Sequence, residues 1–230
     1  MARPGVLLRA FRFSRVHSAR RGGGCENGAV YVKICGLRTG AHARAAVDAG
    51  AHAVGVVMNT TSPRRATPDE AREVIAAAAG DVDTVLVVND LPAEEAARTA
   101  RELGFDVLQL HGRAYAEADF AAALRIMPRL WRATSLDLDP PLEVGAWGEE
   151  RLLLDAPKPG SGERWDLSEL ADRAPEGEWL LAGGLSPDNV AEAITAVRPW
   201  GVDVSSGVEV APGEKSTALI ETFVAAALAN

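Results

Sequence analysis

The chain has 230 residues, of which 47% are hydrophobic, enough for one core and the usual length of a single α/β barrel or doubly wound domain. The formal net charge is −8, but residues 1–24 contain six arginines and no acidic residue, which leaves 18 basic against 32 acidic groups in the rest. This acidic body argues against a nucleic-acid partner, and no apolar stretch reaches the roughly 20 residues that span a bilayer.

Residues 1–28 form an arginine-rich segment that we separate from the folded chain. Arginines mixed with serine and apolar residues, without acidic residues up to position 24, also occur in organelle transit peptides. The interpretation that we favour is a disordered extension with the flexible Gly22-Gly23-Gly24 near its end. The folded part is therefore expected to be a single domain, residues 29–230.

The two cysteines, Cys25 and Cys35, lie close in sequence but in segments of different character, which argues against a structural disulfide. Free thiols are typical of a reducing compartment, so we expect a cytoplasmic protein. No cluster of histidine and cysteine has the spacing of metal ligands, and the sequence predicts no metal site.

From residue 30 onward, short β-rich runs alternate with alanine-rich helical patterns. The eight predicted strands are 30–35, 53–58, 83–88, 106–111, 129–135, 151–155, 178–182 and 201–205. The six predicted helices are 40–49, 68–79, 92–103, 115–125, 187–197 and 215–228. Thr67-Pro68 and Ser186-Pro187 mark two of the helix starts. The connections 139–149 and 166–173 have weaker patterns and are expected to be short or irregular helices.

The alternation of strands and helices implies parallel strands. Eight strand–helix units of about 25 residues match a closed (β/α)8 barrel better than an open sheet. A doubly wound fold is the alternative, but the CGLRTG stretch after the first strand lacks the glycine spacing of a dinucleotide-binding loop. We therefore predict an α/β fold, a single (β/α)8 TIM barrel.

Polar residues in four of the predicted strands share one parity. Because side chains alternate along a strand, one set faces the helices and the other faces the barrel interior. Apolar residues such as Val32 and Ile34 are expected to face the helices, which directs their neighbours inward. The inward polar set is Lys33, Cys35, Gln109, His111, Asp155, Asp203 and Ser205. Most of them lie at C-terminal strand ends, where barrel enzymes assemble their active sites.

Each of these residues alone also has a purely structural interpretation. Cys35 can be a small buried hydrophobic residue, His111 can bond within a turn, and Asp155 can cap a loop. Lys33 and Asp203 are expected to form an ion pair inside the barrel, because a lysine directed into a core needs a partner. Their common position at one end of the barrel is what favours an active site.

Loops rich in glycine and serine follow the last two predicted strands. Gly183-Gly184 come directly after the seventh strand, and Ser205-Ser206-Gly207 follow the eighth. Glycines there let backbone N–H groups approach an anion, and a short helix starting near Gly207 would direct its positive end toward it. Such paired loops form the common phosphate site of barrels, and 157–165 is a third glycine-rich stretch. The other interpretation is that these are ordinary turn glycines.

Six stretches of the chain match, in order and spacing, the signatures of one enzyme family. They are VKICGLRT, SPRRATPDEA, LQLHG, LLLDA, LLAGGLSPDNV and GVDVSSGVEVAPGEKS. This combination resembles phosphoribosylanthranilate isomerase, an enzyme of tryptophan biosynthesis. The resemblance extends from about Val30 to the end of the chain, and it supports the barrel that the strand pattern predicts.

The resemblance implies an Amadori rearrangement of N-(5'-phosphoribosyl)anthranilate to 1-(2-carboxyphenylamino)-1-deoxyribulose 5-phosphate, without metal or organic cofactor. It makes Cys35 the general base and Asp155 the general acid. It places Arg64 where the family holds the anthranilate carboxylate, with the neighbouring Arg65 as the other candidate. The further substrate-binding residues are expected to be Gln109, His111, Gly183, Gly184, Asp203, Ser205, Ser206 and Gly207.

The residue types suit this chemistry. Opening the ribose ring requires a proton on the ring oxygen, which Asp155 can supply if burial or the negative charge of the substrate raises its pKa. A base must then remove the C2' proton. We expect Lys33 to lower the pKa of the Cys35 thiol toward neutrality, so that the thiolate can act as this base.

Two loops depart from the family pattern. Met58 or Asn59 stands where an aromatic residue is common, which would alter the packing around the anthranilate ring. Glu163 and Arg164 follow the glycines of the loop after the sixth strand, where small or basic residues are frequent. An acidic residue near a phosphate is unfavourable unless it points away or pairs with Arg164.

Two other functions remain open at this point. The related isomerase of histidine biosynthesis, or a bifunctional version, is one, although that relative has an aspartate where this chain has Cys35. A barrel that binds phosphorylated sugars without catalysis is the other, although both the acid and the base are present. The expected partner is a phosphorylated small-molecule substrate, with no nucleic acid and no membrane. The protein itself is expected to be a monomer or a homodimer.

Overall fold

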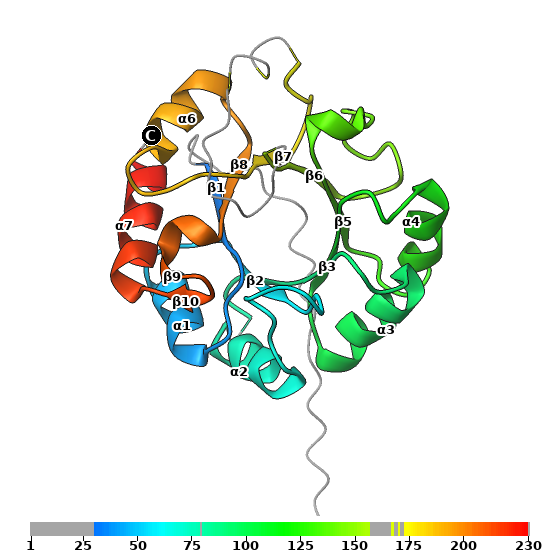
Figure 1. The fold of residues 1–230 in the computed structure, drawn as a ribbon, viewed down its shortest axis with the longest axis horizontal. Coiled ribbons are helices and arrows are strands. Elements are labelled where there is room, and N and C mark those ends of the chain that lie inside the picture. The colour runs from blue at the N-terminus through cyan, green and yellow to red at the C-terminus, as the bar shows by residue number, and fades with distance from the viewer. Residues whose placement is uncertain (1–29, 79, 157–166, 168–169, 171–172, 230) are drawn as a thin grey trace, which may run out of the picture.

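The structure of the protein is a computed structural model that describes residues 30–78, 80–156, 167, 170 and 173–229. Eight parallel strands form a closed barrel in chain order, and the helices lie outside it (Figure 1). This arrangement confirms the predicted (β/α)8 barrel. The arginine-rich residues 1–28 lie outside the described residues, so the domain boundary at residue 29 stays a prediction.

The barrel strands are short, and the helices between them are longer. The strands are β1 Tyr31–Ile34, β2 Ala53–Val57, β3 Asp83–Val88, β4 Val107–His111, β5 Leu130–Thr134, β6 Arg151–Leu154, β7 Trp179–Leu181 and β8 Gly201–Val204. The helices are α1 Gly40–Asp48, α2 Pro68–Ala78, α3 Ala93–Leu103, α4 Glu117–Leu124, α6 Val190–Val197 and α7 Thr217–Leu228. The predicted strands differ from these by one residue at most at either end.

The first and last strands close the barrel by pairing in parallel. Val32 of β1 lies opposite Val202 of β8, and Lys33 lies opposite Asp203. An open sheet has two edge strands with unpaired backbone groups, whereas each of these eight strands has a neighbour on both sides. Closure therefore makes direct neighbours of residues that are 170 positions apart in the sequence.

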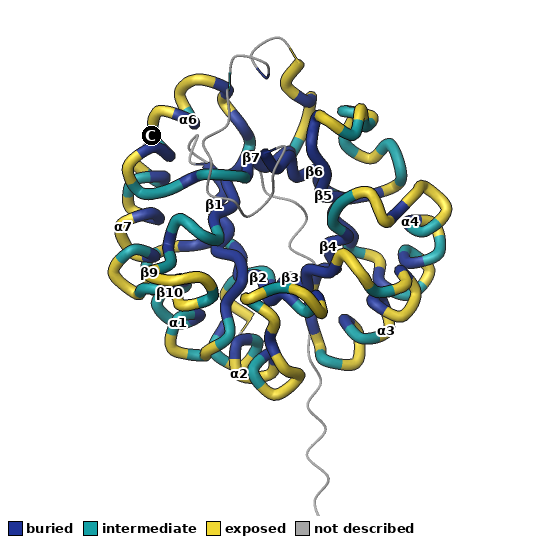
Figure 2. Tube along the Cα trace, viewed as in Figure 1, coloured by how far each residue is buried: buried dark blue, intermediate teal, exposed yellow. Residues whose placement is uncertain are grey.

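Two apolar layers follow from the alternation of side chains along the strands. The outer layer lies between strands and helices and includes Val32, Ile34, Leu108, Leu110, Leu152, Leu154, Val202 and Val204. The inner layer fills the barrel and includes Tyr31, Cys35, Val85, Val107, Trp131 and Leu153. Figure 2 shows the ring of strands as the most deeply buried part, with exposed residues on the outer helices. The predicted parity of the strands is thereby confirmed.

The segment 139–149, expected to be a short or irregular helix, is a loop built around a buried ion pair. Arg132 of β5 points outward, and its Nε donates to Oε1 of Glu149 at 2.7 Å. The other carboxylate oxygen of Glu149 accepts from the Trp147 amide at 2.8 Å, and the Arg132 guanidinium lies 4.9 Å from the Trp147 ring centre. A buried arginine requires a partner, so the loop folds around it instead of forming a regular helix.

Helix starts depend on side chains that bond to backbone amides. Thr67 and Glu70 bond reciprocally at the start of α2, because each side chain accepts from the amide of the other residue. The helix predicted to begin at 187 begins instead at Val190, since Asn189 accepts the Ser186 amide with its side chain. Of the expected segment 166–173, most residues lie outside the described part of the chain.

The segment after β8 begins with the short helix expected near Gly207, which is a 3-10 helix, Ser206–Val208. It leads into a small hairpin of β9 Glu209–Ala211 and β10 Glu214–Lys215, which lies outside the ring of barrel strands (Figure 1). Helix α7 follows, with the Ser216 side chain accepting the Leu219 amide at its start.

The N-terminal end of the barrel is closed by a charged and aromatic cluster. Arg151 begins β6, and its guanidinium lies 4.8 Å from the ring centre of Tyr31, 5.1 Å from Trp131 and 4.3 Å from Trp200. Nε of the same guanidinium donates a hydrogen bond to Oε2 of Glu178 at 3.1 Å. These contacts close the end of the barrel that lies opposite the C-terminal ends of the strands.

Candidate active site

Lys33 and Asp203 form the predicted ion pair inside the barrel. Nζ of Lys33 donates to Oδ1 of Asp203 at 2.8 Å, and both residues are buried. Lys33 lies in β1, two residues before Cys35, and Asp203 lies in the neighbouring strand β8, two residues before Ser205. The pair therefore lies one step deeper in the barrel than the rim.

Cys35 lies at the rim, directly beside Gly55 of β2. The Cys35 amide donates to the Val204 carbonyl at 2.8 Å, which anchors the residue at the end of β1. A Cβ atom on Gly55 would lie 3.0 Å from Sγ of Cys35 and 3.3 Å from Cε of Lys33. The thiol and the lysine stem thus occupy space that only a glycine leaves free.

Burial raises the pKa of the Cys35 thiol, and the positive charge of Lys33 offsets this only in part. The expectation that Lys33 brings the thiol pKa toward neutrality is therefore wrong for the free protein. The main physical reason is burial, and the negative charge of Asp203, the partner of Lys33, also opposes ionisation of the thiol. Cys35 is a free cysteine, and its thiol is protonated in the unliganded protein near pH 7.

Asp155 follows β6, and its Oδ2 lies 3.5 Å from Nε2 of His111 at the end of β4. Burial, and then the negative charge of Asp203, raise the pKa of Asp155 to about 7, as the proposed acid requires. Burial also lowers the pKa of His111 to about 4, so the imidazole is neutral near pH 7. The contact is therefore one between a carboxyl and a neutral imidazole.

Gln109 lies deeper than His111 on the same strand and is 2% exposed. It is paired in register with Trp131 of β5. Within the described chain, neither Oε1 of Gln109 nor Nε1 of Trp131 has a hydrogen-bond partner. Of the predicted substrate-binding residues, Gln109 thus lies below the rim, whereas His111 is at it.

Arg64, in the loop after β2, lies beside the first strand and is tied to the hairpin after β8. Its Nε donates to Oε1 of Glu209 at 2.7 Å and its Nη2 to Oε2 at 2.9 Å. A Cβ atom on Gly36 would lie 3.0 Å from Cδ of Arg64, so the arginine packs next to the residue that follows Cys35. Arg65 is exposed, and Arg64 is the arginine that lies at the site.

The loops after β7 and β8 pack against each other. Gly183 and Gly184 have φ angles of +87° and +65°, which only glycine adopts readily. A side chain on Gly207 would collide with the backbone of Leu185 in the other loop. A Cβ atom on Gly183 would lie 2.7 Å from Oδ1 of Asp155. The glycines thus allow these loops to approach each other and the carboxyl group.

Ser205 and Ser206 begin the loop after β8. Nζ of Lys215, on β10, donates to the Ser205 carbonyl at 2.8 Å and to its hydroxyl at 3.2 Å. The same ammonium donates to Oε1 of Glu209 at 2.7 Å. The third glycine-rich stretch, 157–165, lies outside the described residues, as do Glu163 and Arg164.

Met58 and Asn59 occupy different surroundings. Met58 directly follows β2 and packs against the outer apolar layer. Oδ1 of Asn59 accepts the Asn89 amide at 2.7 Å, which links the loops after β2 and β3. Asn59 thus has a structural role between loops, and the effect of Met58 or Asn59 on packing around the anthranilate ring stays a prediction.

Sequence reasoning missed the contribution of Glu209, Lys215 and Gly55. The Pro212-Gly213 pair, a typical turn signal, could have indicated the hairpin that carries the first two. Gly55 gives no such signal, because a glycine within a strand shows its importance only when its neighbours in space are known.

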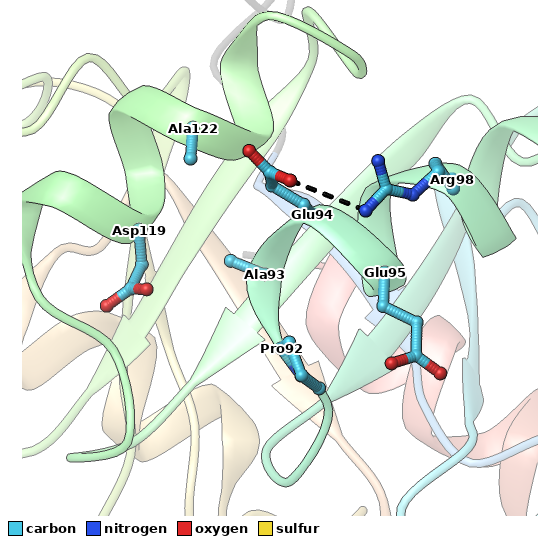
Figure 3. A pocket seen from close by; sticks show the side chains of 7 residues that line it. All are labelled: Pro92, Ala93, Glu94, Glu95, Arg98, Asp119 and Ala122. Atoms are coloured by element: carbon cyan, nitrogen blue, oxygen red, sulfur yellow. Dashed lines mark hydrogen bonds and ion pairs between the residues drawn. The ribbon is translucent and has the colours of Figure 1, made fainter.

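A surface cavity of about 380 Å³ lies elsewhere, on the outside of the barrel between α3 and α4. It is lined by Pro92, Ala93, Glu94, Glu95, Arg98, Asp119 and Ala122. Figure 3 shows the Glu94–Arg98 ion pair at its rim. None of these residues belongs to the predicted site, so the cavity is separate from the groups that carry the chemistry.

No described helix is long and apolar enough to cross a membrane.

The family model for N-(5'-phosphoribosyl)anthranilate (PRA) isomerase matches residues 32–226 of the chain. An N-(5'-phosphoribosyl)anthranilate isomerase of Paracoccus denitrificans is 44% identical over 213 residues, which cover 87% of this chain and 98% of that protein.

Solved structures agree with this match. The crystal structure of TrpF from Jonesia denitrificans is 54% identical, with a TM-score of 0.80, and the match covers 86% of this chain and 97% of that one. A phosphoribosyl anthranilate isomerase in complex with reduced 1-(o-carboxyphenylamino)-1-deoxyribulose 5-phosphate is 33% identical, with a TM-score of 0.72 and coverage of 87% and 100%. The chain therefore belongs to the N-(5'-phosphoribosyl)anthranilate isomerase family, whose members catalyse the Amadori rearrangement of tryptophan biosynthesis, an aldose–ketose isomerisation.

Proposed function

We propose that Asp155 is the general acid and Cys35 the general base in the isomerisation of N-(5'-phosphoribosyl)anthranilate. The observation that carries this assignment is their placement after β6 and β1, facing one barrel mouth, with a carboxyl that keeps its proton up to about pH 7. The two strands are separated by β7 and β8 around the barrel. A sugar bound between them meets the acid on one side and the base on the other.

The reaction begins at the ribose ring. Asp155 donates its proton to the ring oxygen, the bond from this oxygen to C1' breaks, and the nitrogen lone pair forms an iminium. Cys35 as thiolate then removes the C2' proton, and the electron pair of that bond forms the enolamine. Tautomerisation of the enolamine to the ketone completes the rearrangement, so the net reaction consumes no other reactant.

Cys35 must lose its proton before it can act as a base. Its raised pKa in the free protein means that the thiolate paired with a protonated Asp155 is a minor form. Lys33 and Lys215 are the positive groups that favour this form. The active site thus works through a small fraction of molecules in which the acid holds the proton and the thiol does not.

Substrate binding is divided between two ends of the barrel mouth. Arg64 is proposed to hold the anthranilate carboxylate, and the loops with Gly184, Ser206 and Gly207 the phosphate. Support comes from the related isomerase in complex with a reduced ribulose 5-phosphate compound, which contains both a carboxylate and a phosphate. Gly183 and Ser205 belong to the same phosphate loops. His111 is proposed to contact the substrate at the rim, with Gln109 and Asp203 in the layer beneath it.

Two substitutions test the assignment. Cys35→Ala removes the base, and we expect turnover to be abolished while folding and substrate affinity are nearly unchanged. Asp155→Asn removes the acid, and we expect a loss of about 10²–10⁴-fold in kcat. Turnover is measured by the loss of anthranilate fluorescence, and binding with the inactive variants. Full activity of Cys35→Ala would rule out its role as base, and competition with the substrate of the histidine-pathway isomerase tests for a second activity.

We propose a cytoplasmic location, since Cys35 is a free thiol and its reaction depends on staying reduced. The monomer or homodimer expected from the sequence stays a prediction, as does the absence of nucleic-acid partners. Light scattering of the purified protein gives its mass and so the number of subunits. Fractionation of cells tests the location.

A further inference from the structure

Arg64, Glu209 and Lys215 form a buried cluster of two cations and one carboxylate beside Cys35. The side chain of Arg64 is 14% exposed, that of Lys215 2% and that of Glu209 4%. We propose that Glu209 and Lys215 are positioning residues that hold Arg64 ready for the anthranilate carboxylate. This inference rests on the proposed role of Arg64 in substrate binding.

Glu209 engages only one edge of the Arg64 guanidinium. Its two oxygens accept from Nε and Nη2 of Arg64, at 2.7 and 2.9 Å. A guanidinium has a second edge, formed by its two terminal nitrogens, that also suits a carboxylate. Within the described residues, Nη1 of Arg64 has no hydrogen-bond partner. This interaction of Glu209 with Arg64, here called the clamp, thus leaves the edge formed by Nη1 and Nη2 for a second carboxylate.

The charges of the cluster favour an anionic ligand. Glu209 compensates one of the two positive charges, and the cluster keeps a net positive charge. The interactions with Arg64 and Lys215 hold the pKa of Glu209 below its usual value although burial raises it, so its carboxylate is ionised. A substrate carboxylate therefore meets the partly buried guanidinium of Arg64, whose orientation is already fixed. This reduces the entropy cost of binding.

Lys215 connects this clamp to the loop proposed to hold phosphate. Its Nζ donates to Glu209 and to both oxygens of Ser205, at distances from 2.7 to 3.2 Å. Glu209 and Lys215 are cross-strand neighbours in the hairpin of β9 and β10. One ammonium therefore links the carboxylate end of the substrate site with the phosphate end.

The hairpin is held close to the loop that carries Arg64. A Cβ atom on Gly213, at the hairpin turn, would lie 2.5 Å from the Pro63 carbonyl, so the turn packs directly on the residue before Arg64. On the inner side, Gly36 leaves room for Arg64, Ser205 and Lys215 within 3.3 Å of where its own Cβ would be. Loops from the first, second and eighth strands therefore meet at one point.

The test uses a substrate with the carboxylate and one without it. N-(5'-phosphoribosyl)aniline has the same sugar phosphate as the natural substrate but gives Arg64 nothing to bind. For Glu209→Gln we expect kcat/KM for the natural substrate to fall roughly 10- to 100-fold, mainly through KM, because a charged pair is lost. For the aniline compound we expect a change within about threefold. A purely structural role of Glu209 would lower both values alike.

Arg64→Gln separates this inference from the proposed function. If Arg64→Gln impairs both substrates equally, Arg64 does not hold the carboxylate, and the proposed function is wrong at this residue. If Arg64→Gln impairs only the natural substrate but Glu209→Gln impairs neither, the positioning role alone is wrong. We expect Glu209→Gln to cause no further selective loss when Arg64 is already replaced.

Glu149→Gln is the matched control, since Glu149 is also a buried carboxylate bonded to an arginine Nε at 2.7 Å. We expect it to lower stability without changing the preference between the two substrates.

If Glu209→Gln does not fold, Glu209→Asp keeps the charge but is too short to hold both nitrogens, and it should show the same selective loss. Lys215→Met should impair both substrates, because Ser205 loses its tether, and should impair the natural substrate more, because Glu209 loses the ammonium that holds it beside Arg64. An equal effect on both substrates, or unchanged kinetics, in the folded variant would overturn the role of Lys215 in positioning Arg64.

Discussion

Lys33 and Asp203 face each other inside the barrel, with Nζ of the lysine 2.8 Å from Oδ1 of the aspartate. Barrel closure creates this pair, because β1 and β8 lie next to each other with these two residues in register. The pair has a direct effect on the proposed base. Burial is the main cause of the raised pKa of the Cys35 thiol, and the negative charge of Asp203 adds to it and opposes the effect of Lys33, so the thiol stays protonated in the free protein.

Asp203→Asn should therefore lower the pKa of the Cys35 thiol. The substitution removes a negative charge that opposes ionisation and leaves the charge of Lys33 uncompensated. The rate of iodoacetamide alkylation against pH, in a Cys25→Ser background, measures this pKa. Breaking the buried pair should also reduce the free energy of unfolding by about 3–5 kcal/mol. An unchanged alkylation profile in the folded variant would show that the pair does not control the thiol.

The pH dependence of kcat/KM should have an acidic limb that belongs to Asp155. The reaction needs the form with one proton on Asp155 and none on Cys35. This form is a minor tautomer of the singly protonated site, so its population rises with pH up to about 7, the pKa of Asp155, and falls above the raised pKa of the thiol.

Asp155→Asn tests this assignment. Its residual activity should lose the limb near pH 7 and should rise instead with ionisation of Cys35. Because the substrate phosphate also titrates near this range, the same substrate is used for both proteins and only the difference between their profiles is interpreted. A limb that persists unchanged in Asp155→Asn would belong to another group.

Gly55→Ala should impair catalysis more than binding. The added Cβ would lie 3.0 Å from Sγ of Cys35, so the thiol must move away from the C2' proton. We expect kcat to fall roughly 10-fold or more with a smaller change in KM, because misplaced reacting groups lose rate steeply. The stability cost should be about 1–3 kcal/mol.

The control for Gly55→Ala is Gly40→Ala at the start of α1. A Cβ atom there would lie 3.3 Å from the Glu73 carbonyl and 3.4 Å from Cβ of Ala77, far from the barrel interior. It should affect stability alone. Equal kinetic effects of both substitutions would mean that Gly55 does not act through Cys35.

Arg151→Leu should destabilise the protein without changing its kinetics at temperatures where it is folded. The guanidinium lies over Tyr31, Trp131 and Trp200 and bonds Glu178, at the end of the barrel away from Cys35 and Asp155. Its loss should lower the free energy of unfolding by about 2–4 kcal/mol. Urea unfolding followed by tryptophan fluorescence measures this, and a changed kcat/KM would contradict the separation of the two barrel ends.

The fold could be predicted because its signals are local and periodic. Parallel barrel strands are buried on both faces, so a parity of polar residues shared by several strands indicates the inward face, although a single polar residue such as Arg132 can point outward. Lys33, Cys35 and Asp155 were placed correctly on this basis, and the motif resemblance indicated the reaction. Predicted strand ends were accurate because the Ala-rich helices and turn residues between them have different composition.

The sequence by itself thus determined the barrel, the inward set of polar residues and the family. Only the tertiary structure decided the protonation of Cys35, the clamp of Glu209 on Arg64 and the loop around Arg132. These depend on distances between residues far apart in the chain, such as the 145 positions between Arg64 and Glu209. Burial and charge pairing act through space, and local sequence patterns contain neither the distance nor the depth that sets their strength.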